Sequence, residues 1–169
     1  MENNWIFNGK MIEDSDVEKG AIGFIYCITQ ISTGKKYFGR KFLTLAATKT
    51  TNGIKKKIRK DSGWKNYWSS SPFLQELVKT VGEDDFKREI LIFCHSKAFL
   101  NYAEEKILFS LGVLESDNFF NGNIRSKIMK TWFKNFKNLD KLNLSILDLH
   151  LQNHLLLRAQ KAQNKTDKI

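Results

Sequence analysis

Two short apolar runs separated by a Thr-Gly turn make up residues Gly23–Phe42, GFIYCITQISTGKKYFGRKF. Runs rich in β-branched and aromatic residues and bounded by a tight turn are typical of a β-hairpin. The sequence therefore predicts antiparallel strands over residues 23–31 and 36–42. Strand alternation puts Phe24, Tyr26 and Ile28 on one face of the first strand and Ile25 and Cys27 on the other. Tyr37, on the second strand, can lie close to Tyr26.

Apolar spacing and capping residues predict further elements after this hairpin, with Ser71 and Ser96 as the expected caps of two helices. These are a long loop ending in a short helix over residues 43–60, a helix over 72–81, a strand over 86–94, a helix over 97–111 and helices from residue 126 onward. Three short strands packed against helices make an α/β (α+β) domain. We expect a small three-stranded antiparallel sheet flanked by helices, with extra helices at the C-terminus.

Length and composition indicate one folded domain with two flanking segments. The 169 residues suit a single domain, and an apolar fraction of 41% is enough for a core. We expect a polar N-terminal arm over residues 1–20, the domain over 21–124 and a helical extension over 125–169. The extension is rich in leucine and could form a homodimer interface.

The positive charge of the chain is concentrated in one segment. Formal net charge is +10, and the segment from Lys35 to Lys65 carries eleven basic residues and one acid, Asp61. A single basic face is the expected footprint of a protein that binds the DNA backbone, although an anionic membrane surface also attracts such a charge. The candidates for contact with double-stranded DNA are Lys36, Lys41, Lys55, Lys56, Lys57, Lys60 and Lys65.

Several other classes of protein fit the sequence poorly. No apolar run approaches the roughly 18–20 residues that span a bilayer, so we expect a cytoplasmic protein and no membrane partner. Cys27 and Cys94 form no CxxC pair, which argues against a structural zinc site and for reduced thiols. His150 and His154 have a spacing that can bind zinc, but without a third ligand they fit exposed positions on a helix.

Short motifs along residues 21–124 resemble those of the GIY-YIG nucleases, in the order found in that family. Phe24-Ile25-Tyr26 resembles the GIY element, and Tyr37-Phe38-Gly39 resembles the YIG element. NYAEEKILFSL, from Asn101, resembles the helix that carries the metal-binding glutamate, and NFFN resembles the terminal Tyr-Asn element. The chain is similar to the freestanding GIY-YIG proteins of large bacteriophages, which are relatives of homing endonucleases. It departs from the pattern at Phe24, Phe38 and Phe120.

This resemblance gives the two hairpin tyrosines a catalytic role. In the family the first tyrosine activates water and the second supports it, which here are Tyr26 and Tyr37. A tyrosine of pKa about 10 is a poor base until cations stabilise its phenolate, and Lys36, Arg40 and Lys41 could do so. The alternative is that both are ordinary strand aromatics.

Helical spacing distinguishes two adjacent glutamates. Ile107, Leu108 and Leu111 lie three, four and seven residues after Glu104, so Glu104 shares their protein-facing stripe. Glu105 is rotated by about 100° and is expected at the surface. Mg²⁺ keeps most of its waters and needs few protein ligands. We therefore expect Glu104 to hold Mg²⁺ (or Mn²⁺).

The resemblance leaves the catalytic arginine open. The family's arginine would fall at Ala46-Ala47-Thr48, so the candidates are Arg59, which is favoured if the preceding loop is an insertion, and Arg40. Arginine suits the role because its planar fork meets phosphate oxygens bidentately. Tyr67 matches a His or Tyr that often follows the arginine, with a core role as the alternative. Asn121 matches the final Asn that braces the site, or is a turn residue before Gly122.

The resemblance implies a Mg²⁺-dependent DNA endonuclease that hydrolyses phosphodiester bonds, encoded by a phage and of the homing type. It would then act in the cytoplasm of a bacterial host. The alternatives are a restriction-type or DNA-degrading GIY-YIG nuclease, and a DNA-binding module of the same fold without activity.

Overall fold

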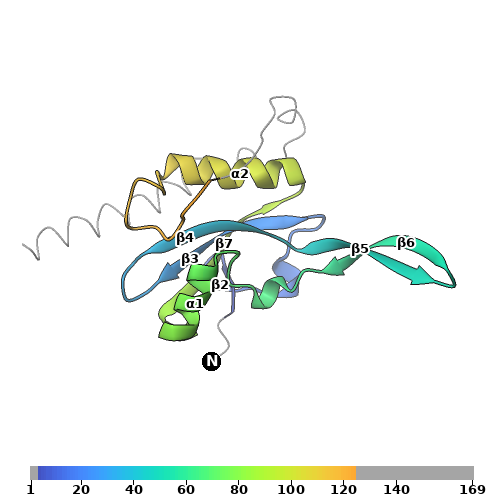
Figure 1. Ribbon diagram of the computed structural model, residues 1–169, viewed down its shortest axis with the longest axis horizontal. Coiled ribbons are helices and arrows are strands. Elements are labelled where there is room, and N and C mark those ends of the chain that lie inside the picture. The colour runs from blue at the N-terminus through green and yellow to red at the C-terminus, as the bar shows by residue number, and fades with distance from the viewer. Residues whose placement is uncertain (1–3, 125–169) are drawn as a thin grey trace, which may run out of the picture.

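The computed structural model describes residues 4–124, which fold into an α+β domain (Figure 1). The main sheet has the strand order β2-β1-β7-β3-β4. Its strands are β1 (Ile6–Phe7), β2 (Lys10–Met11), β3 (Gly23–Gln30), β4 (Lys36–Phe42) and β7 (Phe86–Cys94). β3 pairs antiparallel with β4 and with β7, which confirms the predicted three-stranded core. The sheet is larger than expected, because β1 pairs parallel with β7 and antiparallel with β2.

Two α-helices and three short 3-10 helices accompany the strands in this part of the chain. They are α1 (Pro72–Val81), α2 (Lys97–Ser110), η1 (Asp14–Asp16), η2 (Trp64–Asn66) and η3 (Glu83–Asp85). The predicted caps of both α-helices are confirmed: the Ser71 hydroxyl accepts from the Leu74 amide at 3.3 Å, and the Ser96 hydroxyl accepts from the Phe99 amide at 3.1 Å. Over residues 4–124, no helix is long and apolar enough to cross a membrane.

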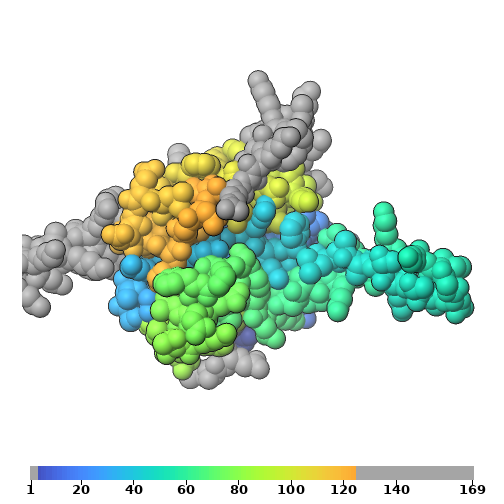
Figure 2. All heavy atoms as spheres, viewed as in Figure 1, coloured from blue at the N-terminus to red at the C-terminus, as the bar shows by residue number. Residues whose placement is uncertain are grey.

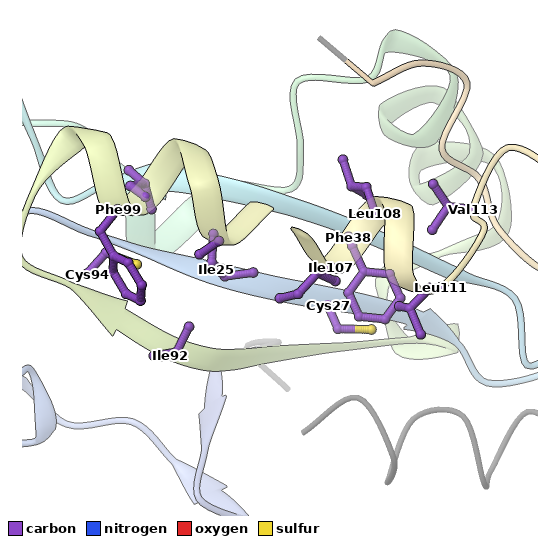
Figure 3. Packing of buried hydrophobic residues seen from close by; sticks show 12 residues of the cluster. Ile25, Cys27, Phe38, Ile92, Cys94, Phe99, Ile107, Leu108, Leu111 and Val113 are labelled. Carbon is purple, nitrogen blue, oxygen red and sulfur yellow. The ribbon is translucent and has the colours of Figure 1, made fainter. Parts of the chain in front are cut away.

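The sheet has a hydrophobic cluster on each face, as the alternation in β3 predicts. On one face Ile25 and Cys27 pack with Phe38 and with the apolar side of α2 (Figure 3). On the other face Phe24 and Tyr26 pack with residues from α1 and from the segment around η2. Both cysteines are buried and free, and burial raises the pKa of the Cys27 thiol to about 11.

The N-terminal segment does not form an arm over its described residues. Trp5 is 1% exposed and makes edge-on ring contacts with Phe24 and Tyr26. Its indole nitrogen donates a hydrogen bond to the Trp64 carbonyl at 2.9 Å. The polar character of residues 1–20 suggested an exposed segment, but the buried Trp5 and the pairing of β1 with β7 hold it against the domain. The expected extension over 125–169, with its histidine pair and dimer interface, lies outside the described residues.

Residues 43–60 differ from the prediction of a long loop ending in a short helix. They form most of a second, two-stranded sheet of β5 (Thr44–Thr51) and β6 (Ile54–Asp61), which projects from the domain (Figures 1 and 2). Asn52 and Gly53 connect the strands with φ of 50° and 76°. Positive φ at both central residues is the requirement of the type I′ hairpin turn, for which Asn-Gly is strongly preferred. The prediction failed because this dipeptide was read as part of a loop.

The position of Trp5 predicts that the N-terminus is part of the folding unit. Trp5→Ala should lower the free energy of unfolding by about 3–5 kcal/mol, because it empties a large volume in the core. Urea unfolding followed by circular dichroism measures this change. Met11→Ala is the control: Met11 is 65% exposed, and a change within about 0.5 kcal/mol is expected. If Trp5→Ala changed the free energy of unfolding as little as Met11→Ala does, the N-terminal segment would not be part of the folding unit.

Candidate active site

A polar cleft of about 320 Å³ lies at the free edge of β4. It is lined by Tyr37, Phe38, Arg40, Tyr67, Ser70, Glu104, Leu108, Asn121 and Asn123. The cleft therefore brings together five of the side chains singled out in the sequence, from β4, the segment after η2, α2 and the segment after α2. Tyr26 and Arg59 are not among its lining residues.

Tyr26 lies directly behind the cleft, across the backbone of Gly39. These two residues are partners in the β3–β4 pair. A Cβ atom at position 39 would lie 2.5 Å from the Tyr26 hydroxyl oxygen and 2.7 Å from its Cζ, so a larger residue there would displace the ring. The ring is stacked on Tyr37 with centroids 6.2 Å apart and meets Tyr67 edge-on at 5.9 Å.

The three tyrosine hydroxyls form one hydrogen-bonded group together with Ser70. Burial raises the pKa of Tyr26 well above 10, and hydrogen bonding to Tyr67 raises it further. Burial also raises the pKa of Tyr37 and of Tyr67, although hydrogen bonds with Tyr26 and Ser70 lower both in part. All three side chains are therefore neutral phenols near neutral pH.

The cations proposed to stabilise a tyrosine phenolate have other partners in this structure. The Lys36 Nζ donates to the Thr29 hydroxyl at 3.0 Å, and the Lys41 Nζ lies over the Tyr67 ring, 3.9 Å from its centroid. Arg40 pairs with Glu104. These cations are directed to other partners, so burial dominates the tyrosine pKa values.

Arg40 and Glu104 form an ion pair on one wall of the cleft. The Arg40 Nε lies 3.1 Å from the Glu104 Oε2, and the Arg40 Nη1 donates to the Asn101 side-chain carbonyl. The Glu104 side chain is 19% exposed. Burial raises the pKa of Glu104, while the Arg40 charge lowers it. As the spacing predicts, Glu104 borders the buried stripe of α2, and it opens into the cleft.

Glu105 differs from its predicted surface position. Its residue exposure is 6%, and its Oε1 has no hydrogen-bond partner among residues 4–124. The helical period correctly turns it away from the stripe that Glu104 borders. Helical spacing shows which side of the helix a residue occupies, but it does not show whether other residues cover that side. The prediction that Glu105 lies at the surface was therefore wrong.

Asn121 holds the edge strand in place. Its side-chain carbonyl accepts from the Phe38 amide at 3.0 Å, and its amide nitrogen donates to the Phe38 carbonyl at 2.8 Å. The Lys36 amide donates to the Asn118 carbonyl at 2.9 Å, and the Lys36 carbonyl accepts from the Phe120 amide at 2.8 Å. The segment after α2 therefore runs along β4 and braces the strand between its two site residues.

The other sequence candidates lie away from the cleft. Arg59 is on the exposed β6, and its Nε donates to the Thr44 hydroxyl at 2.9 Å. Lys65 pairs with Asp14 at 2.6 Å. The remaining lysines proposed for DNA contact, Lys55, Lys56, Lys57 and Lys60, lie on β6.

A comparison against known families identifies the family of this chain. Residues 5–124 match the family model described as "Putative endonuclease segE, GIY-YIG domain". The chain belongs to this GIY-YIG endonuclease family. No curated protein and no solved structure matches it. The predicted resemblance to GIY-YIG nucleases is thus confirmed, and it implies nuclease activity on DNA.

Arg88, which was not among the residues predicted for the site, positions one wall of the GIY-YIG cleft. Arg88 is buried, and its guanidinium lies 4.9 Å from the Trp5 ring centroid and 4.5 Å from that of Trp68. Its Nη1 donates to the Lys65 and Tyr67 carbonyls, both at 3.1 Å, and burial lowers its pKa to about 10. The available signal was a lone arginine at an inward-facing position of an apolar strand.

The donors of the GIY-YIG cleft fit a hard divalent cation. Over residues 4–124, no three His, Cys, Asp or Glu side chains gather into a metal-binding group. The cleft offers the Glu104 carboxylate, amide oxygens and hydroxyls, and neither imidazole nor thiol lines it. Oxygen donors with a single carboxylate suit an ion such as Mg²⁺ that keeps most of its water.

The Asn121 clamp predicts linked losses of stability and activity. Asn121→Ala removes two hydrogen bonds and should lower the free energy of unfolding by about 1–3 kcal/mol. Because β4 also carries Tyr37 and Arg40, DNA cleavage should fall in the variant that is still folded. Asn66→Ala, at an exposed position, is the control for both measurements. Normal cleavage by a destabilised Asn121→Ala would show that the clamp does not position the site.

Proposed function

We propose that this protein is a Mg²⁺-dependent DNA endonuclease of the homing type, encoded by a phage and acting in the cytoplasm of a bacterial host. The single observation that carries the nuclease proposal is the Arg40–Glu104 pair, which faces the Tyr37 and Tyr67 hydroxyls across one cleft. A phosphodiester bound there would meet a cation, a carboxylate and two neutral hydroxyls. The motif resemblance supports the homing type.

Arg40 is the catalytic arginine in this proposal. Its position in the cleft supports this choice over Arg59, which lies on the projecting hairpin. A guanidinium can donate two parallel hydrogen bonds to phosphate oxygens and stabilise the charge that develops there. Binding of DNA would draw Arg40 from Glu104 toward the phosphate and release the carboxylate.

The tyrosines orient the attacking water through their hydroxyls. Tyr37 and Tyr67 line the cleft, so their hydroxyls can contact a water or a phosphate oxygen. Tyr26 is fully buried and hydrogen-bonds to Tyr67. We assign Tyr26 to positioning the other two hydroxyls, and direct contact to Tyr37 and Tyr67. Asn121 keeps Tyr37 in place by holding the adjacent Phe38.

Glu104 would hold the divalent ion in this site. When bound, such an ion neutralises developing negative charge and stabilises the leaving oxygen. Lys36 and Lys41 lie on the same strand as Arg40 and are proposed to contact the DNA backbone near the cleft. Lys65, on η2, is proposed to contact the DNA backbone away from the cleft.

Loss of the carboxylate should abolish cleavage and leave DNA binding intact. Glu104→Gln removes the charge that holds the ion but keeps the volume of the side chain. Supercoiled plasmid should be cut by the wild type with Mg²⁺, and neither by the wild type with EDTA nor by Glu104→Gln. Glu76→Gln, at an exposed position of α1, is the control and should cut normally. Cutting by Glu104→Gln at the wild-type rate would overturn the assignment.

A matched pair of arginine variants tests the choice between Arg40 and Arg59. Arg40→Lys keeps the charge but loses the planar fork, so cleavage should fall by about tenfold or more while DNA binding survives. Arg59→Lys, the same change outside the cleft, should cut at close to the wild-type rate. Rates come from single-turnover cleavage of a plasmid. The reverse pattern would return the catalytic role to Arg59.

A further inference from the structure

The β5–β6 hairpin, residues 44–61, is an arm with almost no core of its own. Each strand has eight residues, and every residue of β6 is exposed. An isolated two-stranded hairpin is marginally stable in water. In Figures 1 and 2 it extends well beyond the rest of the described domain. An arm of this kind contributes little to the stability of the fold. We therefore expect its sequence to be suited to binding a partner.

The charge of the arm indicates a negatively charged partner. Residues 44–61 contain six basic side chains and one acidic side chain, Asp61. They therefore carry half of the formal net charge of +10 of the whole chain. A ribbon of two strands has the width that the major groove of B-form DNA admits. The charge and the shape of the arm thus both indicate duplex DNA as its partner.

The register of the hairpin gives its two faces different chemistry. Side chains of directly paired residues share a face, and faces alternate along each strand. The threonine face, defined as Thr44, Ala46, Thr48, Thr50, Lys55, Lys57, Arg59 and Asp61, carries hydroxyls and cations. The isoleucine face, defined as Leu45, Ala47, Lys49, Thr51, Ile54, Lys56, Ile58 and Lys60, has the same number of cations but exposes large apolar side chains.

We propose that the β5–β6 hairpin lies in the major groove of the substrate DNA with its threonine face toward the base pairs. Arginine, lysine and threonine side chains can hydrogen-bond to base edges, and a threonine methyl can contact that of thymine. The Arg59 Nε–Thr44 Oγ1 hydrogen bond of 2.9 Å spans this face and orders the guanidinium. Leucine and isoleucine on the opposite face have no such donors. This inference rests on the proposed function only for its substrate, duplex DNA.

The arm follows directly on β4, the edge strand of the cleft. β4, which carries Arg40, ends at Phe42, and β5 begins at Thr44. The Ser62 amide donates to the Leu43 carbonyl at 3.1 Å and closes the base of the arm. Eight residues at about 3.3 Å each reach about 26 Å, or roughly eight base pairs. The groove contacts would therefore fix the cleft within about one helical turn of the bases that the arm reads.

Two triple variants with equal charge loss test which face contacts the DNA. One replaces Lys55, Lys57 and Arg59 by Ala, and the other replaces Lys49, Lys56 and Lys60 by Ala. Affinity of the full chain for a 30-base-pair random-sequence duplex is measured by fluorescence anisotropy in EDTA, which prevents cleavage. The threonine-face variant should lose at least about tenfold more affinity than the isoleucine-face variant at the same salt concentration. Equal losses would overturn the proposal, because they would show charge attraction without a preferred face.

A second measurement tests the groove with the wild-type chain. In one duplex every thymidine is replaced by deoxyuridine with a bulky 5-alkynyl group, which fills the major groove and leaves the charge unchanged. This duplex should bind at least about tenfold more weakly, and the minor-groove ligand netropsin should leave binding to ordinary duplex unchanged. Competition by netropsin with no effect of the alkynyl groups would overturn the proposal. Cleavage with Mg²⁺ is scored separately, so a failed groove assignment stays distinct from a failed nuclease proposal.

Discussion

The contact of the Tyr26 ring with the backbone of Gly39 is the constraint on which the rest of the domain depends. It requires the observed β3–β4 register and a residue without a side chain at position 39. It brings the Tyr26 hydroxyl to the edge of the sheet, where it can hydrogen-bond to Tyr67. Trp5 and Phe24 then enclose the ring from the opposite side. The cleft is thus built on the core and not on a mobile loop.

The cleft lies at β4 because this strand is the open edge of the sheet. An edge strand has backbone groups that other segments can use. Asn121 takes the Phe38 amide and carbonyl, and α2 places Glu104 beside Arg40. From β7, Arg88 holds the segment that carries Tyr67 by donating a hydrogen bond to the Tyr67 carbonyl. The cleft therefore joins four parts of the chain: β4, the segment that carries Tyr67, α2 and the segment after α2. The contacts that hold them together are part-buried.

Chemistry and charge are divided between two parts of the molecule. The cleft has few charged groups, and its tyrosines are kept neutral by burial. The β5–β6 hairpin carries half of the formal charge and has no buried residue. Buried hydroxyls need hydrogen-bond partners inside the protein, whereas attraction of a polyanion needs cations that are exposed to solvent. Separating the two avoids a conflict between these requirements.

Local signals in the sequence were sufficient for β3, β4, β7, α1 and α2, and the motif resemblance predicted five of the residues that line the cleft. Alternation in residues 23–30 and caps at Ser71 and Ser96 depend only on neighbours along the chain, so they predicted the core strands, α1 and α2. The tertiary structure decided what depends on distant segments: the burial of Trp5 and Glu105, the neutral state of Tyr26 and the place of Arg40 in the cleft. Burial and ion pairing are properties of atoms brought together by folding, and spacing along the chain does not contain them.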